Sequence, residues 1–196
     1  VATRCILGST LVLQREYTRY DVIATIANAL EPMTIPHLNL PGLALAPAGG
    51  FVSQALPETH WTCWRQIRLD NAKAHLAAIS LDVLCDGLGC IADFGPAYEP
   101  DDRPFIERFF GTLTQTLSRR LPSGIPLHPV AASKRRPDPN ETLRLMVTPE
   151  EMEELLAVTI WNYHAEPHSS LGGMTPLERM RTFVDGIGRP KQQMRK

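Results

Sequence analysis

Two acidic residues stand where carboxylates can do chemistry. Asp70 follows residues 64–69, a β-forming run that ends abruptly at Asp70-Asn71, and Asp and Asn favour turns. We therefore expect Asp70 at the carboxyl end of a strand, where ligands collect in open α/β sheets. Glu107 follows 37 positions later, on a predicted helix. If that helix packs against the same sheet, the two carboxylates can converge on one metal pair. Carboxylate oxygens are ligands suited to Mg²⁺ or Mn²⁺.

The helix that carries Glu107 is expected to begin near residue 102, after a strand at residues 90–94 and a Pro-rich loop. Five apolar residues recur at three- and four-residue spacing and are expected to face the core: Ile106, Phe109, Phe110, Leu113 and Leu117. Gly111 and Thr114 follow Glu107 on its own face, so the surface beside the carboxylate should be bare enough for a metal or a phosphate backbone. On this helix alone, a solvated surface glutamate is the simpler interpretation, and the motif at Asp70 shifts that balance.

The elements that must position these acids alternate between strand and helix patterns. Residues 1–13 lean towards β structure and predict one long strand or a short hairpin, and residues 19–31 predict a helix that Pro32 ends. A second helix is expected over residues 72–87, between the two strands already described. This order predicts an α/β fold with a mixed sheet and helices on both faces.

The carboxyl-terminal part contains two well-marked helix starts. Thr148-Pro149-Glu150-Glu151 and Thr175-Pro176-Leu177-Glu178 both place Thr at the cap, Pro at the first helical position and Glu at the third, which is a capping box. We expect four parts along the chain: a core at 1–121 with a long loop or insertion at 32–62, an extended Pro-rich arm at 122–147, closing helices at 148–185, and a basic tail at 186–196.

Three segments, in the same order, resemble the integrase catalytic core of the DDE recombinases, which include retroviral integrases and the phage Mu and TnsB/TniA-type transposases. They are Asp70-Asn71, the run PAYEPDDRP at 96–104 with IERFFGTL at 106–113, and YHAEPHSSLGGMTP at 163–176. The resemblance covers nearly the whole chain. It implies an RNase H-like fold, which the spacing of strands and helices alone does not separate from other three-layer α/β domains.

The resemblance also implies a reaction, the metal-dependent cleavage of DNA 3′ ends and their transfer to new DNA. Asp70 and Glu107 would be catalytic residues and metal ligands for two Mg²⁺ or Mn²⁺ ions, which lie about 3.5–4 Å apart in such sites. One ion would activate a water or a DNA 3′-hydroxyl, and the other would stabilise the leaving oxygen. Asn71 is expected to shape the turn.

The family has a further catalytic Asp, and the run VATR at residues 1–4 resembles the residues that directly follow it. Neither Glu16 nor Asp21 has the spacing to replace that acid. We therefore expect this chain to lack the first catalytic Asp and the first strand of the sheet. It should then bind metal weakly and be inactive or nearly so.

A formal net charge of −1 does not by itself suggest a DNA-binding protein, but the distribution of charge matters more than its sum. The residues expected to contact DNA are Arg103, Arg108, Thr114, Arg119, Lys134, Arg135 and Arg136. By resemblance, the partners would be transposon ends, target DNA, further copies of the protein on DNA and a target-selecting ATPase. No apolar run approaches the eighteen or so residues of a membrane span, so no membrane partner is expected.

Three other functions stay open from the sequence. The first is a catalytically inactive remnant that binds DNA or partner subunits, the second an RNase H-like nuclease that cuts without joining, and the third a structural interaction module. The four cysteines have no framework spacing, which suits reduced thiols in a cytosol. The resemblance implies that this is a bacterial cytoplasm. A zinc site built from the scattered His and Cys pairs is disfavoured. Trp61, Trp64 and Trp161 are expected in the core rather than as platforms for bases.

Overall fold

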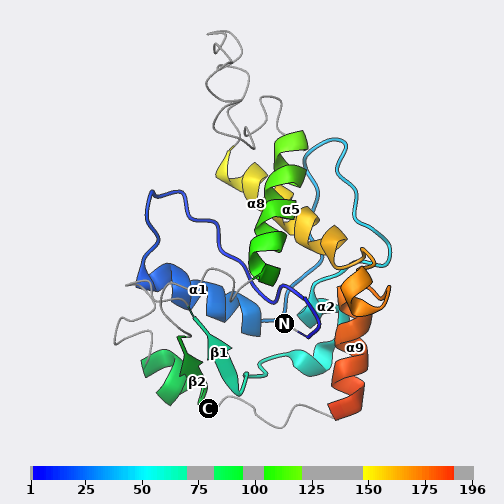
Figure 1. Ribbon diagram of the computed structural model, residues 1–196. Coiled ribbons are helices and arrows are strands. Elements are labelled where there is room, and N and C mark those ends of the chain that lie inside the picture. The colour runs from blue at the N-terminus through cyan, green and yellow to red at the C-terminus, as the bar shows by residue number, and fades with distance from the viewer. Residues whose placement is uncertain (1, 70–81, 95–103, 121–147, 188–196) are drawn as a thin grey trace.

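The computed structural model describes residues 2–69, 82–94, 104–120 and 148–187, with side chains in α5 from 106 to 115 (Figure 1). Its elements are α1 (Arg19–Leu30), α2 (Val52–Ala55), η1 (Pro57–Thr59), β1 (Gln66–Arg68), η2 (Asp82–Gly87), β2 (Ile91–Asp93), α5 (Pro104–Arg120), α8 (Pro149–Tyr163), η4 (Ser169–Leu171) and α9 (Pro176–Ile187). The mixture of helix and strand confirms the expected class in its broad sense. The strands predicted at 64–69 and 90–94 and the helix predicted at 19–31 are also confirmed, with shorter bounds for each.

The described sheet has two strands, β1 and β2, which run parallel. Gln66 is opposite Ile91 and Arg68 is opposite Asp93, so both strands end at the same edge. The backbone N–H of Leu69, one residue beyond β1, donates to the Asp93 carbonyl at 2.8 Å. The larger mixed sheet expected from the order of strands and helices is not seen among the described residues.

Helix α1 packs against this sheet (Figure 1). The Asp21 carboxylate accepts the Thr18 backbone N–H at 2.6 Å and caps the helix start. One stripe of α1 joins the sheet and the segment before β2 in a single buried cluster, which we call the α1 cluster. It is made of Val22, Ile26, Leu30, Cys63, Leu69, Leu84, Leu88 and Cys90. Strand β1 is therefore held on one face by helix packing and on one edge by β2.

The helix predicted over residues 72–87 differs from expectation where it is described. Residues 72–81 lie outside the described part of the chain, and Asp82–Gly87 form the π-helical turn η2. The N–H of Leu88 reaches back five residues to the Val83 carbonyl at 3.0 Å, as such a turn requires. The described part of the predicted range is therefore helical, but its turn is wider than that of an α-helix, and Leu84 and Leu88 lie in the core.

The strand or hairpin predicted at residues 1–13 is also wrong, because residues 2–13 form no strand. Their backbone is bonded to side chains instead of to another strand. The Ile6 N–H donates to the His164 ring at 2.9 Å, and the Asn28 amide donates to the Ser9 carbonyl at 2.9 Å. The side chains still alternate in direction, since Cys5 and Leu7 pack against α2 and α9 while Ile6 packs on a second buried cluster. We call this the α8 cluster, and its buried residues are Phe51, Phe109, Ile160, Trp161 and Tyr163.

His164 is fully buried where several of these segments meet. Its Nε2 accepts the Ile6 N–H, so its ring proton lies on Nδ1, which donates to the Gly50 carbonyl at 2.7 Å. The His164 carbonyl also accepts the Leu177 N–H of α9 at 3.4 Å. Burial, which disfavours the charged ring, lowers the pKa of His164 from 6.5 to about 4.

The long loop after α1 lies along α8 and is bonded to side chains of that helix. The Glu154 carboxylate accepts the backbone N–H groups of Asn39 and Leu40, each at 2.8 Å. Further along, the Asn162 side-chain oxygen accepts the Ala46 N–H at 2.7 Å. These bonds satisfy backbone groups that the loop cannot pair within itself.

The two predicted capping boxes are confirmed at α8 and α9. The Glu151 carboxylate accepts the Thr148 N–H, and the Glu178 carboxylate accepts the Thr175 N–H, both at 2.8 Å. Among the described helices, none combines the length and the apolar character that crossing a bilayer would need.

The buried His164 predicts that stability falls in acid. The ring stays neutral in the folded protein down to about pH 4, while in the unfolded chain it takes up a proton below about pH 6.5. Its contribution is therefore complete above pH 6.5 and is lost towards pH 4, by roughly 3 kcal/mol. Urea unfolding at pH 7.5 and pH 4.5 measures the loss. His164→Gln should flatten this dependence, while His37→Gln, at an exposed ring, should leave it unchanged.

Two glycines give a matched test of close packing. A Cβ added at Gly8 would lie 2.6 Å from the Ala29 nitrogen and 2.8 Å from its Cα, whereas one added at Gly111 meets nothing within 4 Å. Gly8→Ala should lower the free energy of unfolding by about 1–3 kcal/mol. Gly111→Ala, in an exposed helix, should be neutral or raise it by up to about 1 kcal/mol. Equal effects of the two substitutions would contradict the packing of residues 2–13 on α1.

Candidate functional site

The candidate site begins at the edge where β1 and β2 end. Leu69 is buried and held there by its bond to Asp93, and the next residue in the chain is Asp70. Asp70 itself lies outside the described residues, as do four of the predicted DNA contacts, Arg103, Lys134, Arg135 and Arg136. The described structure therefore places the strand end that leads to Asp70.

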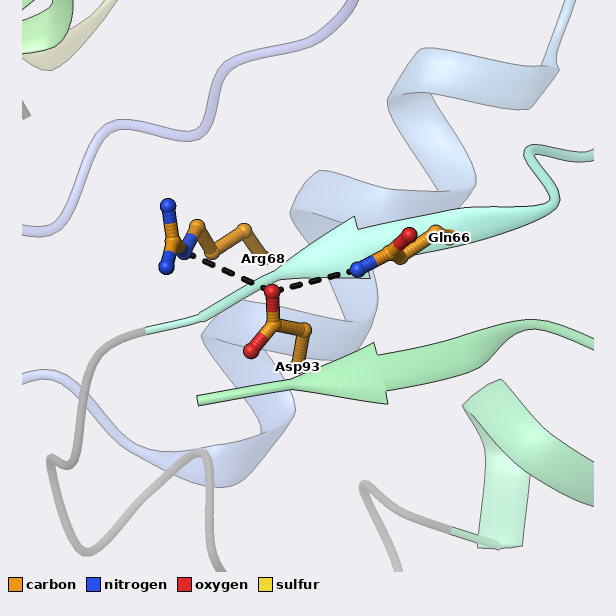
Figure 2. Close-up of polar contacts among 3 residues, drawn as sticks. All are labelled: Gln66, Arg68 and Asp93. Carbon is orange, nitrogen blue, oxygen red and sulfur yellow. Dashed lines mark hydrogen bonds and ion pairs between the residues drawn. The ribbon is translucent and has the colours of Figure 1, made fainter. Parts of the chain in front are cut away.

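Asp93 is the acid that the described residues place at this edge. Its Oδ2 accepts a hydrogen bond from the Gln66 amide nitrogen at 3.1 Å and forms an ion pair with Arg68 Nε at 3.5 Å (Figure 2). Gln66 and Arg68 lie two residues apart on β1 and so project from the same face of the strand. Ile67 projects from the opposite face and packs against the α1 cluster. Asp93 thus joins the exposed faces of both strands.

Helix α5, which carries Glu107, packs on α8 through Phe109. Phe109 is buried, and its ring meets the Tyr163 ring edge-on at a centroid distance of 5.0 Å. Leu113, one turn later, is partly buried in the same cluster. Ile106 and Phe110, however, are 41% and 56% exposed. The inward-facing stripe predicted for α5 is therefore wrong at these two positions, and Leu117 lies outside the described side chains.

This setting of the helix leaves Glu107 exposed. Glu107 lies roughly 160° around α5 from Phe109, since each residue turns the helix by about 100°. Gly111 is exposed beside it and Thr114 is partly buried on the same face, so the surface next to the carboxylate is bare. Arg108 is exposed on the neighbouring face. Arg119 also belongs to α5, but its side chain lies outside the described ones.

The site residues that are described together are thus Glu107, Arg108 and Thr114, all on α5. The separation between Asp70 and Glu107 stays a prediction. Within residues 2–69, 82–94, 104–120 and 148–187, no three His, Cys, Asp or Glu side chains form a group able to hold a metal ion. Asp70 and Glu107 are the residues through which we expect metal to bind.

His and Cys side chains considered for a zinc site make contacts in different parts of the structure. The His60 ring contacts the Ser53 carbonyl at 2.7 Å, and both ring nitrogens of His164 are bonded to backbone. All four cysteines are free thiols, and Cys63 and Cys90 lie in the α1 cluster.

The three tryptophans were predicted to lie in the core, and they differ in how far they are buried. Trp161 is buried against Phe51 and donates its indole N–H to the Ala46 carbonyl at 2.9 Å, and Trp64 is partly buried on the α1 cluster. Trp61 is 45% exposed, so its assignment to the core is wrong. Its φ of 56° and its N–H bond to the Leu30 carbonyl fix the backbone at the end of α1, which leaves the ring outside.

Sequence reasoning missed Asp93 as a site residue, although one signal was present. Asp93 lies at the end of a predicted strand, as Asp70 does, and parallel strands bring such ends to the same edge. The contact with Gln66 and Arg68 also depends on the register of the two strands, which the sequence does not give.

A scan against models of known protein families found no match, and a search of curated protein sequences also found none.

The rotation of α5 can be tested with neighbouring phenylalanines. Phe109→Ala removes a buried ring and should lower the free energy of unfolding by about 3–5 kcal/mol. Phe110→Ala removes an exposed ring and should change it by about 0.5 kcal/mol or less. Urea denaturation of both variants gives the comparison. A larger loss for Phe110→Ala would mean that the helix is turned the other way and that Glu107 does not face solvent.

Proposed function

We propose that this chain is the catalytic core of a DDE transposase or integrase, which cleaves DNA 3′ ends and joins them to new DNA in a metal-dependent reaction. One observation carries the proposal. Two parallel strands end at a common edge that leads directly into Asp70, and the second strand precedes a helix on which Glu107 is exposed beside a bare surface. The resemblance of three segments to the integrase core supports the same function.

The donor set suits the metals of this reaction. Carboxylate oxygens on an open surface match Mg²⁺ or Mn²⁺, which keep waters and accept substrate oxygens. When bound, a pair of such ions supplies an activated oxygen nucleophile and stabilises the leaving oxygen in an in-line displacement. In this proposal Asp70 and Glu107 hold the ions, and Arg108, exposed next to Glu107, contacts the phosphate backbone.

The proposed partners follow from the same reaction. The substrate is DNA, both as the ends of a mobile element and as a target, and several copies of the protein would act together on it. Ile106 and Phe110 are exposed beside Glu107 on α5 and give apolar surface with which another copy of the protein could pack. This proposal includes the four predicted DNA contacts that lie outside the described residues: Arg103, Lys134, Arg135 and Arg136.

A joining assay tests the function. The protein as its gene encodes it would be incubated with DNA that flanks the gene on both sides, a supercoiled target plasmid, and Mg²⁺ or Mn²⁺. We expect covalent joints between a 3′ end and target DNA, found by sequencing. Glu107→Gln should reduce them by about 100-fold or more, because loss of an outer-shell partner of a ligand already costs about 10–100-fold and Glu107 is proposed as a ligand itself.

The matched control is Glu153→Gln, at an exposed acid of α8, which should join DNA normally. Cut strands without joints would favour the RNase H-like nuclease. Binding to DNA with neither cutting nor joining would favour the inactive remnant. Equal joining by the Glu107→Gln variant and the unmodified protein would contradict the proposed site.

A further inference from the structure

We propose that Asp93 is a positioning residue for the metal site, acting through Gln66 and Arg68 on the end of β1. We call the three side chains the strand-end contact. This inference rests on the proposed function, since the residue that benefits from it is Asp70, the next residue after Leu69. It adds to that function a residue that would hold no metal itself.

The strand-end contact lies at the last register pair of the sheet (Figure 2). The Asp93 carboxylate joins two side chains of β1, at 3.1 Å from the Gln66 nitrogen and 3.5 Å from the Arg68 nitrogen. The Asp93 backbone carbonyl accepts the Leu69 N–H at 2.8 Å. Asp93 therefore contacts β1 through its side chain, and through its main chain it holds Leu69, the residue before Asp70.

The short length of the strands gives this contact its local importance. Each described strand has three residues, and a two-stranded pair is marginal without further support. The α1 cluster supports the inner face through Ile67 and Leu69, while the outer face is joined by the strand-end contact. The Arg68 and Asp93 side chains are 46% and 36% exposed, so this pair adds little to global stability. Its effect is on the position of the strand end.

A purely electrostatic role for Asp93 makes a different prediction. If its negative charge alone attracted metal ions, removing the positive charge of Arg68 would strengthen metal binding. If Asp93 positions the strand end through Arg68, removing either partner weakens metal binding. The two roles therefore predict opposite signs for Arg68→Gln.

The experiment compares Asp93→Ala, Arg68→Gln and the charge swap Arg68→Asp with Asp93→Arg, each in the protein as its gene encodes it. Mn²⁺ titration followed by electron paramagnetic resonance gives the half-saturating Mn²⁺ concentration. Hydrogen exchange followed by NMR gives the protection of the Leu69 N–H. The matched controls are Asp185→Ala and Arg181→Gln, two exposed residues of α9.

We expect both single variants to raise the half-saturating Mn²⁺ concentration by up to about tenfold, the lower limit for loss of a group that contacts a metal ligand directly, because these side chains act one residue away from Asp70. Leu69 exchange should become up to about fivefold faster, which corresponds to about 1 kcal/mol for an exposed ion pair. The charge swap should return both values towards those of the unmodified protein, and the α9 controls should change neither.

Three results would overturn the inference: unchanged Leu69 exchange in both single variants, faster exchange with unchanged Mn²⁺ binding, or tighter Mn²⁺ binding by Arg68→Gln. A protein that binds no Mn²⁺ before any substitution would instead overturn the proposed function. In that case Leu69 exchange alone decides whether the strand-end contact holds β1.

Discussion

The structure depends most on the hydrogen bonds of one buried ring. His164 ends α8, and its two ring nitrogens bond the backbone of Ile6 and of Gly50, which lie far apart in the sequence. Its carbonyl bonds the first turn of α9 through Leu177. Because the ring is fully buried, each of these bonds is made without competition from water, and an unpaired nitrogen there would be costly. His164 thus links the end of α8 to the amino-terminal segment and the long loop through its ring, and to α9 through its carbonyl.

The same arrangement sets the orientation of α5. Tyr163, the residue before His164, presents its ring to Phe109, and this contact determines which side of α5 faces the core. Glu107 lies on the opposite side and is therefore exposed. The other half of the proposed site is built separately, by α1 packing on β1 and by the pairing of β1 with β2. Two local cores therefore hold the two halves, a helix face and a strand end.

Local signals in the sequence predicted most of the elements. The capping boxes at Thr148 and Thr175 and the helix predicted at residues 19–31 depend on neighbours within a few residues, and each was found where expected, the helix one residue shorter. Residues 2–13 show the limit of such signals. Their alternation resembles that of a strand, but a strand also needs a backbone partner, and here the partner of Ile6 is a histidine side chain from 158 positions away.

The prediction of which side of α5 faces the core failed at two positions for a related reason. Periodicity identifies the five apolar residues of this face but not which of them lies at its centre. The contact with Tyr163 places Phe109 at the centre and leaves Ile106 and Phe110 at the exposed margin. Asp70 and Glu107 were identified from their motifs. Asp93 becomes significant only through the register that sets it opposite Arg68, which is a property of the assembled sheet.

The central claim is that Asp70 and Glu107 share one metal site. It is tested most directly by a crystal structure of the protein, as its gene encodes it, grown with Mn²⁺ and measured for the anomalous signal of manganese. The account predicts manganese bound by both carboxylates, with the two side chains roughly 4–8 Å apart, as two metal–ligand bonds and a gap between ions require. Manganese bound elsewhere, or carboxylates well beyond that range, would contradict it.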